Sequence, residues 1–131
     1  MTQLEKIVKF WQESGEKDLT IARKLFKSKD YGYCLFFCHL TLEKVLKAII
    51  IQKTNKLAPF SHDLTKLAIL SGVIFKKAHK AELDNITHFN IAGRYDDEKK
   101  QFYKKCTRPY ALKFLKITEE IFIWLKENYQ K

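Results

Sequence analysis

The amino-acid sequence predicts an all-α protein, an up-down bundle of four to five helices. Apolar residues recur at steps of three and four along most of the chain, which places them on one face of a helix. Only 4 Gly and 2 Pro occur in 131 residues, too few for the frequent turns of an all-β chain. The length fits one domain over residues 1–131, and 46% apolar residues are enough for its core.

The two longest helices come first. Residues 3–27 carry an apolar stripe from Leu4 to Phe26 that includes Gly15. This glycine costs the helix about 1 kcal/mol relative to alanine, or else allows a close helix crossing. Asp30 is expected to cap a second helix over 31–53, the most apolar element and therefore the expected centre of the bundle. Its predicted core positions are Leu35, Cys38, Leu42, Val45 and Ile49.

A loop and a short helix follow. The loop covers 54–61 and is punctuated by Pro59 and Ser61. The third helix opens at His62-Asp63-Leu64 and ends near Gly72, a residue that suits a helix C-terminus.

The last third of the chain predicts two more helices. The fourth covers 74–92 and stops at Gly93, with one face formed by Phe75, Ala78, Ile86 and Phe89. The polar stretch 94–106 predicts a loop with a helical turn. Thr107 then caps a final helix that has Pro109 in its first turn, where proline is tolerated.

The net charge of +10, from 25 Lys+Arg against 15 Asp+Glu, favours anionic partners. Nucleic acid, nucleotides and acidic proteins all fit, although a basic surface also serves solubility alone. The first residues are charged throughout and lack the apolar core of a signal peptide, and no uncharged apolar run reaches about 18 residues. We therefore expect a cytoplasmic protein with no membrane association.

Three cysteines, Cys34, Cys38 and Cys106, do not look like a disulfide framework, because their number is odd and two lie in an apolar helical pattern. Together with His39 they could bind a metal ion. Cysteine is also a frequent small core residue, and Cys38 falls on the main apolar stripe. We expect no metal and no cofactor.

Several dispersed segments resemble the HEPN family, the helical "higher eukaryotes and prokaryotes nucleotide-binding" domain. The most informative is 30–49, DYGYCLFFCHLTLEKVLKAI, followed by His62-Asp63-Leu64 and Arg94-Tyr95-Asp96 in the same order as in the family. The resemblance covers residues 10–128. It implies a four- or five-helix bundle, commonly a homodimer and often encoded beside a small nucleotidyltransferase. Members are metal-independent RNase toxins or non-catalytic relatives that bind a nucleotide or a partner.

The RNases of that family use an arginine followed four to six residues later by a histidine. The arginine binds the phosphate while the histidine exchanges the 2′-hydroxyl proton. Neither Arg23, Arg94 nor Arg108 is followed by a histidine at that spacing. The sequence thus predicts no RNA cleavage, unless the fold brings Arg94 and a histidine such as His62 to one open cleft.

Arg94, with Tyr95 and Asp96 beside it, is the first candidate ligand-binding group. Its guanidinium could pair with a phosphate or with a carboxylate of a partner. The alternative is an arginine that caps the fourth helix through its carbonyls and pairs with Asp96 or Asp97.

Glu43, Lys47 and His62 form the second candidate group. Glu43 and Lys47 lie four residues apart, so they could line a polar groove or simply form an intrahelical ion pair. His62 could carry a proton or bond locally at the start of its helix. His39, His79 and His88 have no partner by spacing.

A basic run on 99–105 contains Lys99, Lys100, Lys104 and Lys105 around Phe102 and Tyr103. Nucleic-acid binders combine such charges with aromatic faces, but the stretch also fits an exposed connection whose aromatic rings pack inward. The leading hypothesis is a non-catalytic module that binds a nucleotide or nucleic-acid phosphate near Arg94 and partners a nucleotidyltransferase. The alternatives are a toxin RNase with a divergent site and a structural dimerisation domain.

Overall fold

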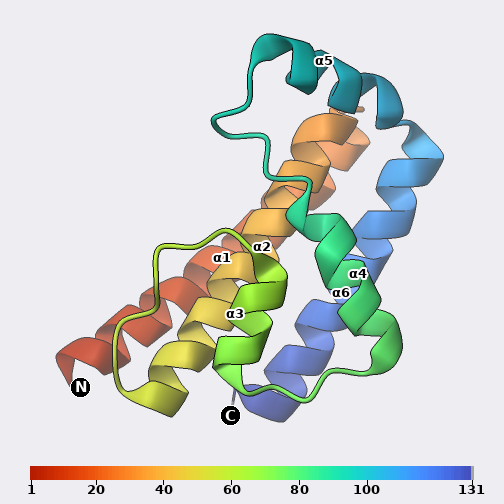
Figure 1. Cartoon of the computed structure of the whole chain (residues 1–131). Coiled ribbons are helices and arrows are strands. Elements are labelled where there is room, and N and C mark those ends of the chain that lie inside the picture. The colour runs from red at the N-terminus through yellow and green to blue at the C-terminus, as the bar shows by residue number, and fades with distance from the viewer. Residues whose placement is uncertain (131) are drawn as a thin grey trace.

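The computed structural model describes residues 1–130, and this part of the chain contains six helices joined by loops (Figure 1). They are α1 (Gln3–Lys27), α2 (Tyr31–Thr54), α3 (Leu64–Ser71), α4 (Lys77–Thr87), α5 (Asp96–Lys105) and α6 (Arg108–Tyr129). No strand occurs in this range, so the all-α prediction is confirmed. The last residue of the predicted domain, 131, lies outside the described residues.

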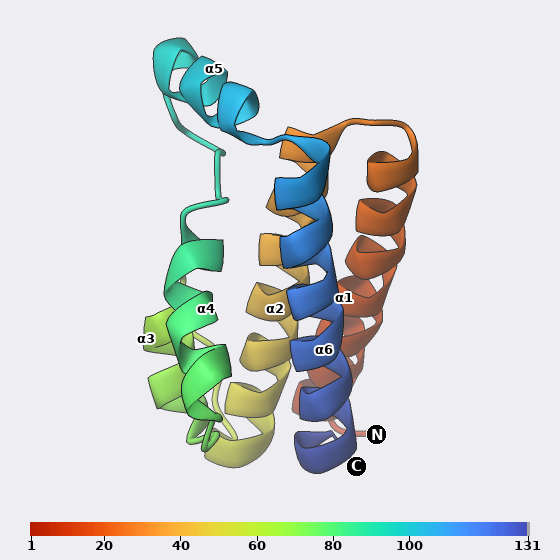
Figure 2. The ribbon, with the colours of Figure 1, turned by 90° about the vertical axis from the view of Figure 1, so that its right-hand side faces the viewer.

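The four longest helices form the bundle. Along the chain α1, α2, α4 and α6 alternate in direction, while α3 is inserted between α2 and α4 (Figures 1 and 2). The short helix α5 lies across one end of the bundle, and both ends of the chain lie at the other (Figure 2). The sequence predicted four to five helices, one or two fewer than the six observed.

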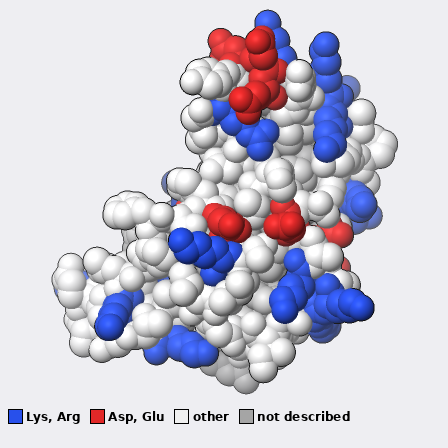
Figure 3. Space-filling view, viewed as in Figure 1, with Lys and Arg blue, Asp and Glu red and all other residues white. Residues whose placement is uncertain are grey.

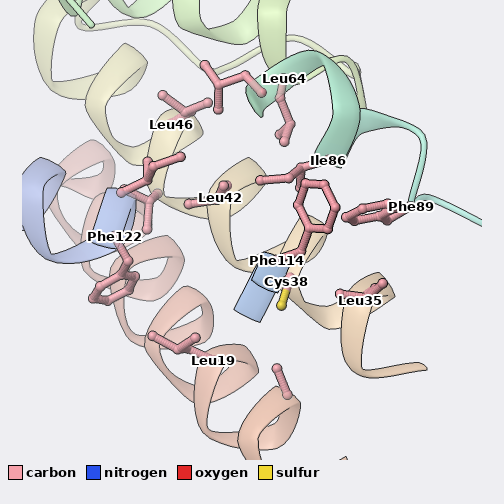
Figure 4. Close-up of a cluster of buried hydrophobic side chains, with 14 of the residues drawn as sticks. Leu19, Leu35, Cys38, Leu42, Leu46, Leu64, Ile86, Phe89, Phe114 and Phe122 are labelled. Carbon is pink, nitrogen blue, oxygen red and sulfur yellow. The ribbon is translucent and has the colours of Figure 1, made fainter. Parts of the chain in front are cut away.

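Helix α2 lies at the centre, as predicted. All five of its predicted core positions are buried, and the helix packs against each of the other five. Figure 4 shows how its side chains meet residues from α1, α3, α4 and α6. The labelled members are Leu19, Leu35, Cys38, Leu42, Leu46, Leu64, Ile86, Phe114 and Phe122, with Phe89 from the loop after α4.

Gly15 sits where α1 crosses α2. A Cβ atom at Gly15 would lie 3.3 Å from both the Thr41 carbonyl oxygen and Val45 Cγ2, so the two helices approach closely here. Nearby, the Lys44 ammonium lies 2.6 Å from the carboxylate of Asp18, which is buried. The glycine therefore allows the close crossing that the sequence left open.

Two of the three predicted capping residues, Gly72 and Thr107, cap their helices, and Asp63 is a further cap. The Asp63 carboxylate accepts hydrogen bonds from the backbone N–H groups of Thr65 and Lys66 in α3, and Thr107 caps α6. Gly72 ends α3 with a φ of 69°, the left-handed region that favours glycine. Asp30 occupies the N-cap position of α2, but its side chain accepts from the Ser28 hydroxyl and caps no backbone N–H.

The predicted fourth helix over 74–92 is too long, since α4 covers only Lys77–Thr87. Phe75 lies in the preceding loop, where its ring packs against Trp124, and Ala78 is exposed. The buried face of α4 is formed by His79, Leu83 and Ile86. The loops on both sides bury apolar residues without being helical, and this extended the apparent helical pattern.

The predicted loop over 94–106 contains a ten-residue helix, α5. Its first turn is acidic, with Asp96, Asp97 and Glu98, and its last turn is basic, which suits the helix dipole. Phe102 is its single buried side chain and attaches it to the core.

Residues 1–130 contain no helix that is both long and apolar enough to cross a bilayer.

Candidate functional site

A groove of about 480 Å³ lies where the end of α4, helix α5 and the start of α6 meet. We call it the Arg94 groove. It is lined by Asn85, His88, Phe89, Arg94, Glu98, Gln101, Phe102, Lys105 and Tyr110. Concave sites of this size with an aromatic wall and a few polar groups are typical of ligand binding.

Arg94 is held at the edge of this groove by two contacts. It follows Gly93, whose φ of 81° turns the chain sharply after α4. One guanidinium N–H donates to the carbonyl oxygen of His88, the C-cap residue of α4. The guanidinium carbon also lies 5.9 Å from the centre of the Phe102 ring. Since a guanidinium has five N–H donors, most remain available to an anion in the groove.

The other polar groups of the groove favour a negatively charged ligand. His88 is exposed, and its Nδ1 donates to the Asp84 carbonyl at 2.8 Å. Lys105 lies 5.7 Å above the Tyr110 ring. Burial raises the pKa of Tyr110, so its hydroxyl stays protonated and can donate a hydrogen bond. Glu98 is the one carboxylate among the lining residues.

Tyr95 and Asp96, which the sequence grouped with Arg94, do not line the groove. Tyr95 is 81% exposed, and Asp96 belongs to the acidic first turn of α5. The capping role considered for Arg94 is present, since it binds a carbonyl at the end of α4. Within residues 1–130 Arg94 forms no ion pair with Asp96 or Asp97.

Glu43, Lys47 and His62 lie together in a second cluster. His39 is its fourth member, and we call the four residues the Glu43 cluster. The buried Glu43 carboxylate accepts from Lys47 Nζ at 3.1 Å and from His62 Nδ1 at 2.8 Å. The fourth member, His39, is fully buried, and its Nε2 donates to the His62 carbonyl at 2.7 Å. The cluster thus ties the loop before α3 to the middle of α2.

Burial determines the direction in which the pKa of His39 is shifted. Burial lowers the pKa of His39 below its ordinary 6.5, more than the nearby Glu43 carboxylate raises it. The His62 side chain is different, because 67% of it is exposed while its Nδ1 remains on Glu43. The sequence analysis gave His39 no partner, although its four-residue spacing from Glu43 places the two side chains on the same face of a helix. No sequence signal brings His62 to Glu43, because a loop delivers it.

The Arg94 groove and the Glu43 cluster are separate. None of Glu43, Lys47 and His62 lines the Arg94 groove, so the pairing of Arg94 with His62 is not formed there. The histidine that shares the groove with Arg94 is His88. It precedes Arg94 by six residues, the reverse of the order in the arginine-first motif.

A sequence model of the HEPN domain matches residues 8–128, which include both clusters. The chain belongs to the HEPN domain family. No curated protein and no solved structure matches the chain.

The three cysteines of this HEPN domain are free thiols in the interior. Burial raises the pKa of Cys106 to about 11, so this thiol stays protonated at neutral pH. Among residues 1–130, no three His, Cys, Asp or Glu side chains come together as a metal site.

The basic run of this HEPN domain lies on α5, where its lysines and its aromatic rings separate. Lys100, Lys104 and Lys105 are exposed, whereas Phe102 is buried and Tyr103 packs over Gly32. The rings therefore pack inward, the second of the two interpretations drawn from the sequence. On the face drawn in Figure 3, acidic side chains gather over the start of α5, and Lys and Arg lie in several separate groups.

Proposed function

We propose that this HEPN domain binds the phosphate of a nucleotide or a nucleic acid in the Arg94 groove without cleaving it, as a homodimer that works with a small nucleotidyltransferase. The observation that carries the binding proposal is the position of Arg94. Its guanidinium is fixed by the His88 carbonyl and the Phe102 ring, yet it faces an open groove with Lys105. A prepositioned arginine loses little freedom when it binds a phosphate oxygen pair.

The walls of the groove support a nucleotide better than inorganic phosphate alone. Phe89 and Phe102 are buried in its wall, and the half-buried Tyr110 gives it aromatic surface that a base can contact. The protonated Tyr110 hydroxyl and the Gln101 amide add hydrogen-bonding groups. Glu98 disfavours a second phosphate close to it, so we expect one phosphate at Arg94 rather than a run of phosphates along α5.

Binding is tested with the Arg94→Ala variant. Nucleoside monophosphates and short labelled RNA and DNA oligonucleotides should raise the melting temperature of the native protein and bind it measurably. Arg94→Ala should weaken binding at least about tenfold, as expected for one lost charge-assisted contact. Arg108→Ala is the matched control, because Arg108 also lies over a ring, that of Phe26 at 5.2 Å, but does not line the groove. Equal loss in both variants would mean that charge alone, and not this groove, accounts for binding.

A second candidate function, RNA cleavage, is favoured by one observation: His88 and Arg94 line the same groove. His88 Nε2 could take the proton of a 2′-hydroxyl while Arg94 stabilises the phosphate. The two side chains would then act in the reverse order along the chain from the arginine-first motif.

Cleavage is measured on a single-stranded RNA with EDTA present, because the proposed groups need no metal. RNA should stay intact under the leading proposal. Products ending in a cyclic phosphate, lost in both His88→Ala and Arg94→Ala but kept in Arg108→Ala, would establish the RNase instead. If the native protein neither binds nor cleaves these ligands, the remaining alternative is a structural dimerisation domain.

The homodimer is supported by the first half of α2. Residues 31–42 carry no charge, and the stripe of Tyr33, Phe36, Phe37 and Leu40 keeps part of its surface exposed. An isologous pair of such stripes would bury apolar area away from the cationic surfaces. In sedimentation velocity, Leu40→Lys should convert the dimer to a monomer, while Lys17→Ala should not. A native chain that sediments as a monomer contradicts this part of the proposal.

The nucleotidyltransferase partner is supported by membership of the HEPN family, whose resemblance implied such pairing. An adjacent gene for a small nucleotidyltransferase, and co-purification of the two native proteins, are the expected observations. Absence of binding when both proteins are mixed at micromolar concentration would remove the partner from the proposal.

A further inference from the structure

Exposed apolar side chains gather on one part of the surface, in the half of the bundle away from α5. Half of the ten large apolar side chains that are exposed in residues 1–130 fall within residues 57–74. This segment comprises the end of the loop after α2, helix α3 and the start of the loop before α4 (Figures 1 and 2). We call the surface formed by its five exposed apolar side chains the α3 face: Leu57, Phe60, Ile69, Leu70 and Ile74.

The loop after α2 is held in place, so its apolar side chains project from a fixed backbone. Ala58 packs against a small buried cluster of α1 and α2, and His62 donates to the Glu43 carboxylate. Phe60 lies between these two anchors and is fully exposed, and Leu57 is also exposed. Exposed apolar side chains that a fixed backbone holds close together mark a site of interaction.

Helix α3 and the turn after it add three aliphatic side chains. The helix faces the core through Leu67, which leaves Ile69 and Leu70 on its outer side. Ile74 is 83% exposed, although the Tyr129 hydroxyl accepts a hydrogen bond from its backbone N–H. Side chains exposed to this degree stand out from the surface and do not line a groove.

The chain around the α3 face is strongly basic. Residues 53–77 contain five lysines and one carboxylate, that of Asp63. All five lysines are exposed, and the Lys53 side chain lies against Gly72 at the end of α3. In the lower part of Figure 3, separate groups of Lys and Arg side chains lie around uncharged surface. The lysines of this segment are Lys53, Lys56, Lys66, Lys76 and Lys77.

The elements that contact this segment do not remove its excess of positive charge. Their charged residues near the contacts are Glu5, Lys6 and Lys9 of α1, Glu43 and Lys47 of α2, Lys80, Glu82 and Asp84 of α4, and Lys126 and Glu127 of α6. These add five lysines and five carboxylates, so the excess of four lysines in the segment remains. Asp63 and Asp84 lie at the start of α3, where Asp63 caps the helix and Asp84 accepts from the Thr65 hydroxyl at 3.3 Å. The exposed aliphatic side chains of α3 lie in its second half.

We propose that the α3 face binds the surface of an anionic phospholipid bilayer, with Phe60 and the aliphatic side chains inserted below the headgroups and the lysines on the phosphates. Four of the five apolar side chains are aliphatic, so they offer a nucleic-acid base little aromatic surface to stack on. They also project outward, whereas an amphipathic helix of a partner protein is bound in a groove. A fluid bilayer accepts projecting side chains without a complementary shape.

The proposal concerns a contact with one leaflet. The expectation of no membrane association rested on the lack of a spanning segment and of a signal peptide, and a surface contact needs neither.

Binding of the native chain is measured by flotation with two kinds of vesicle, phosphatidylcholine alone and phosphatidylcholine with phosphatidylglycerol in equal parts. Affinity for the anionic vesicles should be at least about tenfold higher, because each lysine near an anionic surface adds to the attraction. Insertion is located with Phe60→Trp, whose fluorescence should be quenched by lipids with brominated acyl chains. Tyr95→Trp is the matched control, because Tyr95 is exposed beside α5, and its new indole should not be quenched.

Two pairs of variants separate insertion from general charge. F60S/I74S should weaken binding to the anionic vesicles at least about tenfold. Y95S/I123S removes the same kinds of exposed side chain outside the α3 face and should change affinity less than about twofold. K56Q/K66Q should also weaken binding at least about tenfold, whereas K100Q/K104Q, which removes the same charge from α5, should change it less than about twofold.

Several results would overturn the proposal. Equal affinity for the two kinds of vesicle would remove the anionic lipid, and native binding by F60S/I74S would mean that charge alone accounts for the association. A native dimer that F60S/I74S dissociates, without vesicle binding, would make a second copy the occupant. Binding of an RNA oligonucleotide that is lost in K56Q/K66Q, again without vesicle binding, would make nucleic acid the occupant. Arg94→Ala should bind the vesicles normally, which separates this proposal from phosphate binding in the Arg94 groove.

Discussion

At the residue scale, Glu43 shows how a polar group is kept inside an apolar helix. Its two carboxylate oxygens accept from Lys47 and His62, so neither the carboxylate nor the buried ammonium is left without a partner. Removing one member of such a pair leaves the other charge buried and uncompensated. The same residue fixes the loop that carries His62.

We predict that Glu43→Gln lowers the free energy of unfolding by about 3 kcal/mol, because Lys47 stays buried without its countercharge. Urea denaturation measures the change. The matched control is Glu13→Gln, whose lysine partner is exposed, and it should cost less than about 0.5 kcal/mol. Similar values for the two variants would mean that the Glu43 cluster contributes no more than a surface pair.

His39 should make the stability depend on pH. Its pKa in the folded protein lies below the ordinary 6.5 because of burial, so the unfolded chain takes up the proton first as pH falls. The contribution is fully present above pH 6.5 and is lost as pH falls from there toward the lowered pKa, by at most about 1.4 kcal/mol per pH unit. His39→Gln should flatten the stability curve below pH 6.5 in denaturation series. A slope unchanged by the substitution would assign the effect to other groups.

At this scale the sequence named the right residues more often than the right contacts. Glu43 and Lys47 were paired correctly because helical spacing alone brings them together. His62 was not connected to Glu43, because a loop brings the two together. Such contacts are set by the packing of whole elements, which no local spacing reports.

At the scale of elements, the attachment of α5 depends on Gly32. A Cβ atom at this position would lie 2.3 Å from Cδ1 of the Tyr103 ring, so the ring of α5 packs directly on the backbone of α2. The pairing explains why a glycine is found inside the first turn of the most apolar helix.

Gly32→Ala should destabilise the native protein by about 1 kcal/mol, since a clash of about 2 kcal/mol exceeds the gain in helix propensity. In the Tyr103→Ala background the same substitution should become neutral or stabilising, because the clash is gone. Thermal denaturation of the four proteins measures this cycle, and amide exchange should be faster in α5 of Gly32→Ala. Additive effects of the two substitutions would contradict the contact.

The prediction of elements from sequence failed where buried apolar residues are not helical and where a helix is mostly exposed. The half-buried Phe75 and the buried Phe89 lie in the loops on either side of α4, and their spacing continued the helical pattern beyond the helix. Helix α5 has the opposite character, with one buried side chain and no apolar stripe. Its acidic first turn and basic last turn were a readable signal of a helix, but they carry less weight than periodicity.

At the scale of the whole molecule, the excess of positive charge should act on any polyanion, while the Arg94 groove should act on one phosphate. The logarithm of the affinity for single-stranded nucleic acid falls with the logarithm of salt concentration by about 0.7 per phosphate neutralised. We expect Arg94→Ala to reduce this slope by about 0.7 and Arg108→Ala to leave it unchanged, as measured by anisotropy titrations at several salt concentrations. An unchanged slope in Arg94→Ala would place the contacted phosphate elsewhere.

The bundle as a whole was predictable because the long helices α1 and α6 carry apolar stripes and α2 is apolar around most of its circumference. The Arg94 groove was only half predictable. Arg94 itself was named from the sequence, whereas Phe89, Lys105 and Tyr110 reach it from three different segments. A groove between elements is a property of their crossing, so its composition follows from the assembled fold.

Phe102 has one further consequence for how the groove can change. The ring that fastens α5 to the core is also the wall on which Arg94 rests. Trimming it to admit a bulkier ligand would therefore loosen the very helix that shapes the opening. Room can be gained without that penalty from solvent-facing side chains such as Asn85 and Gln101, so selectivity for ligand size should be tuned there.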